Sequence, residues 1–269
     1  IAELQNGVWT GQEPDFASPM NLGGHCAKGA AAREHGSGEK RLKYPMKLVD
    51  GVYRRISWDT ALQEISDRLL AIRKESGPDA LFVVGSSKHS NEQSYLLRKF
   101  VSFFGTNNMD HQARICHSTT VAGVANTWGY GAMTNSYNDE QNSKCLLFLG
   151  SNAAEAHPVS MLHTLHAKEN GAKVIVADPR YTRTAAKADI YVRHRSGSDV
   201  ALLFGILYHV FKNGWEDKQY IAARVYGMDQ VQKDVMAKWT PDKVADVTGV
   251  PEAEVFNIAK TLAENRPGF

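Results

Sequence analysis

Short apolar runs alternate with helix-like segments through the middle of the chain. The clearest runs are 145–149 and 173–177, with a helix-length segment at about 158–169 between them. A weaker run, 190–192, is followed by an apolar helical segment at 200–212. Continuous apolar strands connected by helices are typical of a parallel sheet covered on both faces. The sequence therefore predicts an α/β fold with a mostly parallel, doubly wound sheet and flanking helices.

The preceding part of the chain has a different texture. Residues 1–55 are rich in Gly, Pro and polar side chains, and they predict loops with short strands. Asp50-Gly51, between two such strands, is a strong hairpin signal. The apolar stripe of 57–76 then predicts a helix that stops at Gly77-Pro78. We further expect a strand at 80–84, a helix at 91–104 and only helices in the final third, 215–264; the strands ending near Val84, Leu149 and Ala177 should share one sheet.

Composition excludes several classes of protein. With 31 basic and 29 acidic side chains, the chain has almost no net charge and no strong electrostatic field. Neither nucleic acid nor an acidic membrane surface is therefore expected as a partner. The three cysteines are an odd number without regular spacing, which argues against a disulfide framework. No apolar run reaches the roughly 18 residues needed to cross a bilayer. Because Ile1 is not an initiator methionine, we expect an interior piece of a longer chain.

A thiol and an imidazole are adjacent at Cys116-His117, in a predicted strand-to-helix connection near the carboxyl edge of the sheet. Ser118 and Thr119 are common N-cap residue types, and the free N–H groups of a helix start stabilise an anion. A cysteine placed there has a lowered pKa and serves readily as a nucleophile or metal ligand. The alternative is a buried cysteine that acts as a small hydrophobic residue. This stretch alone supports the two interpretations about equally.

Polar side chains follow each predicted strand of the middle region. In a doubly wound sheet, ligands bind beyond the carboxyl ends of the strands. Carboxylates there suit a guanine edge or a ribose diol, and glycines beside helix starts suit a pyrophosphate. The alternative role for each polar residue is to cap a helix. We expect Asp178 and Asp199 to lie within one ligand's reach of Asn152 and Glu155, in a site that has neither a G-x-G-x-x-G nor a Walker A motif.

A further cysteine, Cys26, lies two residues before Lys28 in a Gly-rich loop. Taken alone, this spacing indicates an incidental cysteine more strongly than a cluster ligand. Together with the other motifs, however, the chain resembles the catalytic subunit of molybdenum- or tungsten-dependent formate dehydrogenase, in the dimethyl sulfoxide reductase superfamily. The motifs that carry the resemblance are His25–Ala30, Arg41–Pro45, Ile56–Asp59, Ala113–Ser118, Gly129–Asn135, Asn152–Pro158 and Asp178–Ala185.

The resemblance implies a metal held by a bis(molybdopterin guanine dinucleotide) cofactor. Cys116 stands where the family places its metal-binding cysteine or selenocysteine, and His117 matches the histidine beside formate. Cys26 resembles the last cysteine that binds a 4Fe-4S cluster, and Lys28 the lysine between that cluster and the pterin. Residues in the segments that match the family's dinucleotide-binding regions are Asn152, Glu155, His157, Asp178, Arg180, Thr182, Gly197 and Asp199.

The same resemblance implies a domain organisation. Residues 1–55 would be the end of the iron–sulfur domain with short β segments, and 56–269 a truncated dinucleotide-binding domain that is helical at its C-terminal end. The other cluster cysteines, the substrate-binding arginine and the remaining domains would lie outside the chain, so the piece should be inactive alone. An iron–sulfur electron-transfer subunit is the expected partner. Similarity to the exported respiratory type favours a periplasmic location over a cytoplasmic one.

Rival interpretations remain open at this point. The chain could belong to a nitrate reductase or another oxotransferase of the superfamily, which formate and nitrate turnover would separate. It could also be a nucleotide-binding regulatory domain in which Cys26 and Cys116 are structural. Molybdenum or tungsten in the intact protein would exclude that second class.

Overall fold

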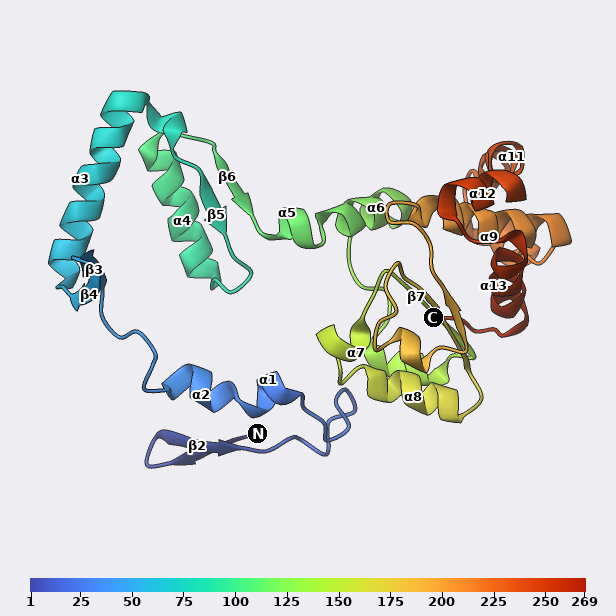
Figure 1. Ribbon diagram of the computed structural model, residues 1–269, viewed down its shortest axis with the longest axis horizontal. Helices are drawn as coiled ribbons and strands as arrows, with labels where there is room; N and C mark the ends of the chain where they lie inside the picture. Colours follow the sequence, from blue (N-terminus) through green and yellow to red (C-terminus); the bar gives the residue numbers. More distant parts are fainter. The chain divides into compact units, whose positions relative to one another are not determined.

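The computed structural model describes the backbone of residues 1–269 and every side chain except that of Ser37. It contains two compact units, Ile1–His35 with Asn135–Phe269, and Gly36–Thr134, which are traced in Figure 1. Both units mix helices with parallel strands, so the predicted α/β class is confirmed. The units divide the chain near residues 35 and 134, and the domain boundary near residue 55 stays a prediction.

The larger unit is built on a parallel sheet of three strands in the order β7-β8-β9. The last residues of the chain run parallel beside the free edge of β7, where the Leu147 N–H donates to the Phe269 carbonyl at 2.9 Å and the Phe269 N–H to the Cys145 carbonyl at 2.8 Å. The chain therefore moves outward from β7 to β9 and then returns to the other side of β7. The strands are β7 (Cys145–Leu149), β8 (Lys173–Ala177) and β9 (Ile190–Val192).

Both faces of this sheet are buried, as predicted. Ile175 and Val192 belong to one apolar cluster, together with Leu202 and Ile258 from the helices on that side. The alternate strand residue Val174 belongs to a second cluster on the other face. Because successive side chains of a strand point to opposite faces, continuous apolar runs were needed to fill both clusters.

Helices of the larger unit cover both faces of the sheet. Ala167 of α8 packs in the second cluster, whereas residues of α9, α12 and α13 pack in the first. An antiparallel hairpin, β1 (Ala2–Gln5) with β2 (Val8–Gln12), opens the chain. The remaining elements are α1 (Ala27–Ala30), α2 (Ala32–Ser37), η2 (Tyr137–Asn142), α7 (Ala153–Ala156), α8 (Met161–Glu169), η3 (Ala185–Lys187), α9 (Asp199–Asn213), α10 (Lys218–Arg224), α11 (Met228–Lys238), α12 (Pro241–Thr248) and α13 (Glu252–Glu264).

The smaller unit confirms several local predictions. Asp50 and Gly51 adopt φ of 48° and 77°, the left-handed backbone that a tight hairpin turn requires. The predicted helix start at Ser57 is confirmed, and Ser57 accepts a hydrogen bond from the Thr60 N–H. Ser90, which was not singled out from the sequence, caps the helix at 91–104 in the same way. The elements are β3 (Met46–Val49), β4 (Val52–Arg55), α3 (Trp58–Ser76), η1 (Pro78–Ala80), β5 (Val83–Gly85), α4 (Asn91–Phe104), β6 (Met109–His111), α5 (Ala113–Cys116) and α6 (Ser118–Trp128).

One prediction about the sheet stays a prediction, because the strand ending near Val84 belongs to the smaller unit and β7 and β8 to the larger one. Within the smaller unit, β5 pairs with β6 in a parallel sheet. The bounds of β6 were not predicted, because this short strand directly follows the turn-rich Asn107-Asn108 and is not apolar throughout. The helix α4 connects β5 to its parallel partner β6. Across the described residues, no helix is both long and apolar enough to cross a membrane.

The packing of α9 predicts a cost for filling a glycine. A Cβ atom added at Gly205 would lie 2.6 Å from Val244 Cγ1 and 3.2 Å from Val255 Cγ1. Both neighbours are buried and β-branched, so they have little freedom to move. We expect Gly205→Ala to lower the free energy of unfolding, because overpacking costs about 1–3 kcal/mol against a helix-propensity gain of about 1 kcal/mol. Urea denaturation of the chain measures this change.

Gly123, inside α6, is the matched control. A Cβ added there meets no described atom within 4 Å. Gly123→Ala should therefore raise the free energy of unfolding through helix propensity alone. Equal stabilisation by both substitutions would contradict the close packing of α9 on α12 and α13.

The sheet also predicts unequal reactivity of the cysteines. Burial, with a smaller contribution from the Asp189 charge, raises the pKa of Cys145 to about 11. Since the thiolate is the reactive form, Cys145 should resist iodoacetamide at pH 8 while the exposed Cys116 is alkylated. Mass spectrometry of the folded, metal-free chain measures the labelling, with the urea-unfolded chain as control. Native labelling of both thiols at the same rate would contradict the burial of Cys145.

Candidate functional site

Cys116 and His117 lie in the connection that follows β6. Cys116 is the last residue of the short helix α5, and its N–H donates to the Gln112 carbonyl at 3.2 Å. His117, with φ −138° and ψ 2°, separates α5 from α6. Both side chains are exposed. The predicted strand-to-helix connection is therefore present, with one helical turn inserted, and the alternative of a buried Cys116 is not what the structure shows.

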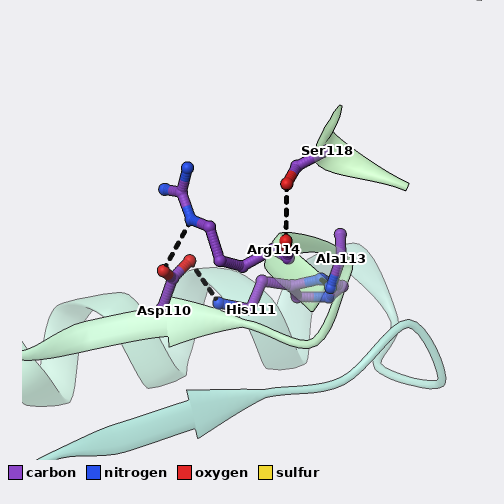
Figure 2. A network of polar contacts seen from close by, with 5 residues as sticks. All are labelled: Asp110, His111, Ala113, Arg114 and Ser118. Carbon is purple, nitrogen blue, oxygen red and sulfur yellow. Dashed lines mark hydrogen bonds and ion pairs between the residues drawn. The ribbon is translucent and has the colours of Figure 1, made fainter. Parts of the chain in front are cut away.

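Polar contacts fix the turn before these two residues (Figure 2). The Asp110 carboxylate accepts hydrogen bonds from Arg114 Nε and from the His111 N–H, each at 2.8 Å. The Ala113 N–H donates to His111 Nδ1 at 3.1 Å, so this ring nitrogen is unprotonated. The bond from Arg114, followed by the one from His111, lowers the pKa of Asp110. The start of α5 is thus tied to β6.

The expected N-caps are wrong in detail. His117 occupies the N-cap position of α6 with no capping hydrogen bond from its side chain in the described structure, and Ser118 is already helical. The Ser118 hydroxyl instead donates to the Arg114 carbonyl at 2.6 Å. This carbonyl lies within reach because α5 places it one turn earlier, and a serine hydroxyl competes readily for such an acceptor. Ser118 therefore links α5 to α6.

The carboxyl ends of β7, β8 and β9 form a second candidate site in the larger unit. Gly150, which follows β7, has φ of 59°, and a Cβ added there would lie 3.8 Å from Asp199 Oδ1. Asp199 begins α9 and contacts His194 Nε2 at 3.2 Å. Asp178 follows β8, and its Oδ1 accepts from the Arg180 N–H at 2.8 Å. Groups that follow β7 and β9 are thus brought together, with β8 between them.

A polar cluster extends this edge toward α7. Thr184, which is fully buried, donates to Asn152 Oδ1 at 3.1 Å and accepts from the Ala154 N–H at 3.0 Å. The Asn152 amide donates to the Glu155 carboxylate, which also pairs with Arg183 Nε at 3.2 Å. Asn152 and Glu155 therefore lie together, and their shared site with Asp178 and Asp199 stays a prediction. Thr184 and Arg183 were not singled out from the sequence, although both fall in the motif that follows β8.

The other predicted dinucleotide residues have different surroundings. His157 is exposed at the end of α7, with its ring 6.2 Å from the Tyr137 ring. Thr182 is buried, and its Oγ1 accepts from the Ala185 N–H at 3.1 Å. Arg180 is exposed, and Gly197 has φ of 83° in the turn before α9. Thr182 therefore acts as a cap, as the alternative interpretation expected. His157 and Arg180 are exposed and remain available to a ligand.

An open pocket of about 350 Å³ lies at the ends of β8 and β9. His194 lines it and is buried, and its Nδ1 has no hydrogen-bond partner among the described atoms. An unpartnered buried nitrogen is costly, so it points to a ligand or water at this position. The sequence signal for His194 was weak, because it is one polar residue between two arginines. The lining residues are Pro179, Arg193, His194, Arg195, Ser196, Thr248 and Gly249.

Cys26 and Lys28 lie at the start of α1 in the larger unit. Cys26 is half-buried at the N-cap position, and the N–H groups of Gly29 and then Lys28 lower the pKa of its thiol. Lys28 is exposed. Among the side chains that the structure describes, no group of at least three His, Cys, Asp or Glu residues is arranged to hold a metal ion. Each cysteine could therefore contribute only one ligand to a larger set.

Comparison with known proteins identifies related sequences. Residues 41–266 match the family model described as molybdopterin oxidoreductase. The chain is 38% identical over 228 residues to formate dehydrogenase H of Escherichia coli, covering 83% of this chain and 32% of that protein. It is 37% identical over 265 residues to the F420-dependent formate dehydrogenase 2 subunit alpha of Methanococcus maripaludis, covering 97% of this chain and 38% of that protein.

A solved structure is also similar. Acetylene hydratase from Pelobacter acetylenicus superposes with a TM-score of 0.74 at 28% identity, over 100% of this chain and 37% of that protein. The chain thus spans roughly a third of the length of the relatives that it matches. These matches agree with the resemblance found in the motifs.

The Asp110 pair predicts a pH effect. Because the pKa of Asp110 is lowered in the folded chain, the pair stabilises the fold above the unfolded value of about 3.9, and this stabilisation is lost as the pH falls through the folded pKa. Arg114→Met should move the titration midpoint of Asp110 up toward the unfolded value. NMR titration of the carboxyl carbon measures it. Lys47→Met, which breaks a separate ion pair with Glu64, is the control; an equal shift in both variants would contradict the assignment.

Proposed function

Because the chain belongs to the molybdopterin oxidoreductase family, we propose that it is part of the catalytic subunit of a formate dehydrogenase. The observation that carries this proposal is the exposed Cys116-His117 pair on a turn tied to β6 through Asp110 and Arg114. A soft metal needs an accessible thiolate at a fixed position, and this turn supplies one. The names of the sequence relatives support formate as the substrate.

The edge of the β7–β9 sheet suits the guanine dinucleotide of the proposed bis(molybdopterin guanine dinucleotide) cofactor. Asp178 and Asp199 offer carboxylates for the N–H groups of guanine or for ribose hydroxyls, and the unpartnered Nδ1 of His194 calls for a polar group. Arg193 and Arg195 beside the pocket suit a pyrophosphate. The residues present therefore fit such a ligand. The wider assignment includes Asn152, Glu155, His157, Arg180, Thr182 and Gly197.

Cys116 would be the protein ligand of the molybdenum or tungsten. In this proposal the cofactor supplies the other ligands, and one exposed thiolate completes the set. When bound, the metal centre supplies an acceptor for two electrons. Oxidation of formate, HCOO⁻ → CO₂ + H⁺ + 2e⁻, breaks the C–H bond, and the proton leaves separately. His117 follows Cys116 directly, so it would orient the carboxylate and hold or pass on this proton.

Cys26 and Lys28 would provide the route by which electrons leave. Cys26 would bind a 4Fe-4S cluster together with cysteines outside this chain, and the lowered pKa of its thiol favours the thiolate that a cluster requires. The exposed Lys28, two residues away, would lie between cluster and pterin. The electrons would then pass to an iron–sulfur partner subunit. We place the complete protein in the periplasm as part of this proposal.

Substitution at Cys116 and His117 in the complete protein tests the proposal. Cys116→Ser should abolish most formate oxidation, because a neutral hydroxyl is a poor ligand for a soft metal centre. His117→Ala should keep the metal but lower turnover about 10²- to 10⁴-fold, the range for a positioned acid or base. Turnover is measured per metal and per pterin, so that lost cofactor is not counted as lost chemistry.

The control is His166→Ala, the same change at an exposed histidine of α8, which should leave turnover unchanged. Full activity in Cys116→Ser would overturn the ligand assignment. Wild-type turnover per metal in His117→Ala would remove His117 from the mechanism. Nitrate turnover without formate turnover in the wild type would assign the chain to another branch of the family.

A further inference from the structure

The segment that carries Cys26 is joined to α8 through the loop 20–24. His163 Nε2 lies 2.7 Å from the Met20 carbonyl oxygen, across 143 residues of sequence. The Met20 sulfur accepts from Ser136 Oγ at 3.3 Å. A Cβ added at Gly24 would lie 3.1 Å from Leu162 Cδ1, so the loop backbone packs directly on the helix. Residues 20–24, which precede Cys26 in the chain, therefore pack against α8.

The bond between His163 and Met20 joins a buried side chain to a partly exposed loop. His163 is fully inaccessible to solvent, and a carbonyl oxygen can only accept, so Nε2 carries the proton and donates. Its Nδ1 has no partner among the atoms that the structure describes. His163 is thus buried with Nε2 paired and Nδ1 unpaired, and packing alone does not explain a histidine at this position. Loss of the donor would remove the hydrogen bond that holds the Met20 carbonyl against α8.

The helix that carries His163 is itself held firmly. Thr164, the next residue, donates its hydroxyl to the Glu140 carboxylate of η2. Glu140 is only 3% exposed, and burial raises its pKa, against the opposing influences of Thr164 and His163. In addition, α8 connects β7 to β8 and packs through Ala167 on the sheet. His163 is therefore a fixed point relative to the carboxyl ends of these strands.

The path from Met20 to Cys26 is short and tightly turned. Leu22 and Gly23 have φ of 50° and 74°, and the Gly24 N–H donates to the Asn21 carbonyl at 2.6 Å. Cys26 follows two residues later as the N-cap residue of α1. A displacement of Met20 would therefore also displace Cys26 and Lys28, because the turn between them is short and hydrogen-bonded.

We propose that His163 is a positioning residue for electron transfer: its Nε2–H bond to Met20 fixes the Cys26–Lys28 segment relative to the dinucleotide-binding sheet. This inference rests on the proposed function, in which both electrons released from formate leave the metal centre through the cluster held in part by Cys26. His163 touches neither substrate nor cofactor in this role. It controls where the cluster lies, and so the rate at which the cluster is reduced.

The test compares His163→Phe with His163→Gln in the complete protein with its cofactors. Phenylalanine keeps the ring but has no N–H, whereas the glutamine amide can again donate near the place of Nε2. After rapid mixing with formate, His163→Phe should reduce the cluster several-fold more slowly than wild type, because the rate of electron transfer falls as the distance between the redox centres grows. The KM for formate should stay within twofold of wild type. His163→Gln should recover most of the rate.

Hydrogen exchange provides a readout that does not depend on activity. The amides of residues 18–28 should exchange faster in His163→Phe than in wild type or His163→Gln. The matched control is His209→Phe, at another buried histidine of the larger unit, on α9, which should lower stability without altering cluster reduction or exchange at 18–28. If His163→Phe does not accumulate as folded protein, His163→Asn, whose amide is too short to reach Met20, replaces it with the same expectations.

Two results would overturn the proposal. One is a wild-type rate of cluster reduction, per loaded cluster, in His163→Phe with unchanged exchange at 18–28. The other is an equal defect in His163→Gln and His163→Phe, which would mean that packing and not the N–H bond is responsible. Absence of formate turnover and of a cluster signal in the wild-type protein would instead overturn the proposed function, while the exchange measurement would still test the anchoring of the loop.

Discussion

Burial of both faces of the β7–β9 sheet is the constraint on which the larger unit depends. A strand such as β8 places Val174 in one cluster and Ile175 in the other, so neither face tolerates a polar residue without a partner. Helices must then cover both sides, and the polar residues between strands and helices are left at the strand ends. The same requirement that forms the core therefore concentrates polar side chains at one edge.

The order of the strands gives that edge its shape. The chain proceeds from β7 to β9 and then returns through the C-terminal helices to lie beside β7 at residues 267–269. The direction of winding thus reverses at β7, and in open α/β sheets a crevice for ligands forms at such a reversal. Gly150 and Asn152 follow β7 directly, which explains why this strand end combines a left-handed glycine with a hydrogen-bonded polar cluster.

Buried polar groups attach further parts of the larger unit to this framework. Thr184 joins the segment after β8 to the start of α7, and His163 joins α8 to the N-terminal loop. Glu140 and Thr164 hold η2 against α8 in the same way. A hydrogen bond made by a buried side chain contributes modestly to stability when formed, but is costly for that side chain to leave unmade. Such bonds therefore select one placement of each attached segment, which a site assembled from separate loops requires.

The local features of this protein were determined by its sequence alone. The Asp50-Gly51 turn, the helix start at Ser57 and the apolar runs of β7 and β8 all depend on residues close together in the sequence, so their patterns could be interpreted directly. The motif around Cys116 was equally visible, and it placed the cysteine in the correct connection.

Tertiary structure decided what depends on distant partners. It paired β5 with β6, made Ser118 a link to Arg114 and not a cap, and gave roles to Thr184 and His194. The pairing of His163 with Met20 spans 143 residues, and no local pattern distinguishes this histidine from any other on an amphipathic helix. The physical reason is that a hydrogen bond between distant residues depends on how the intervening elements pack, and packing is a property of the whole fold.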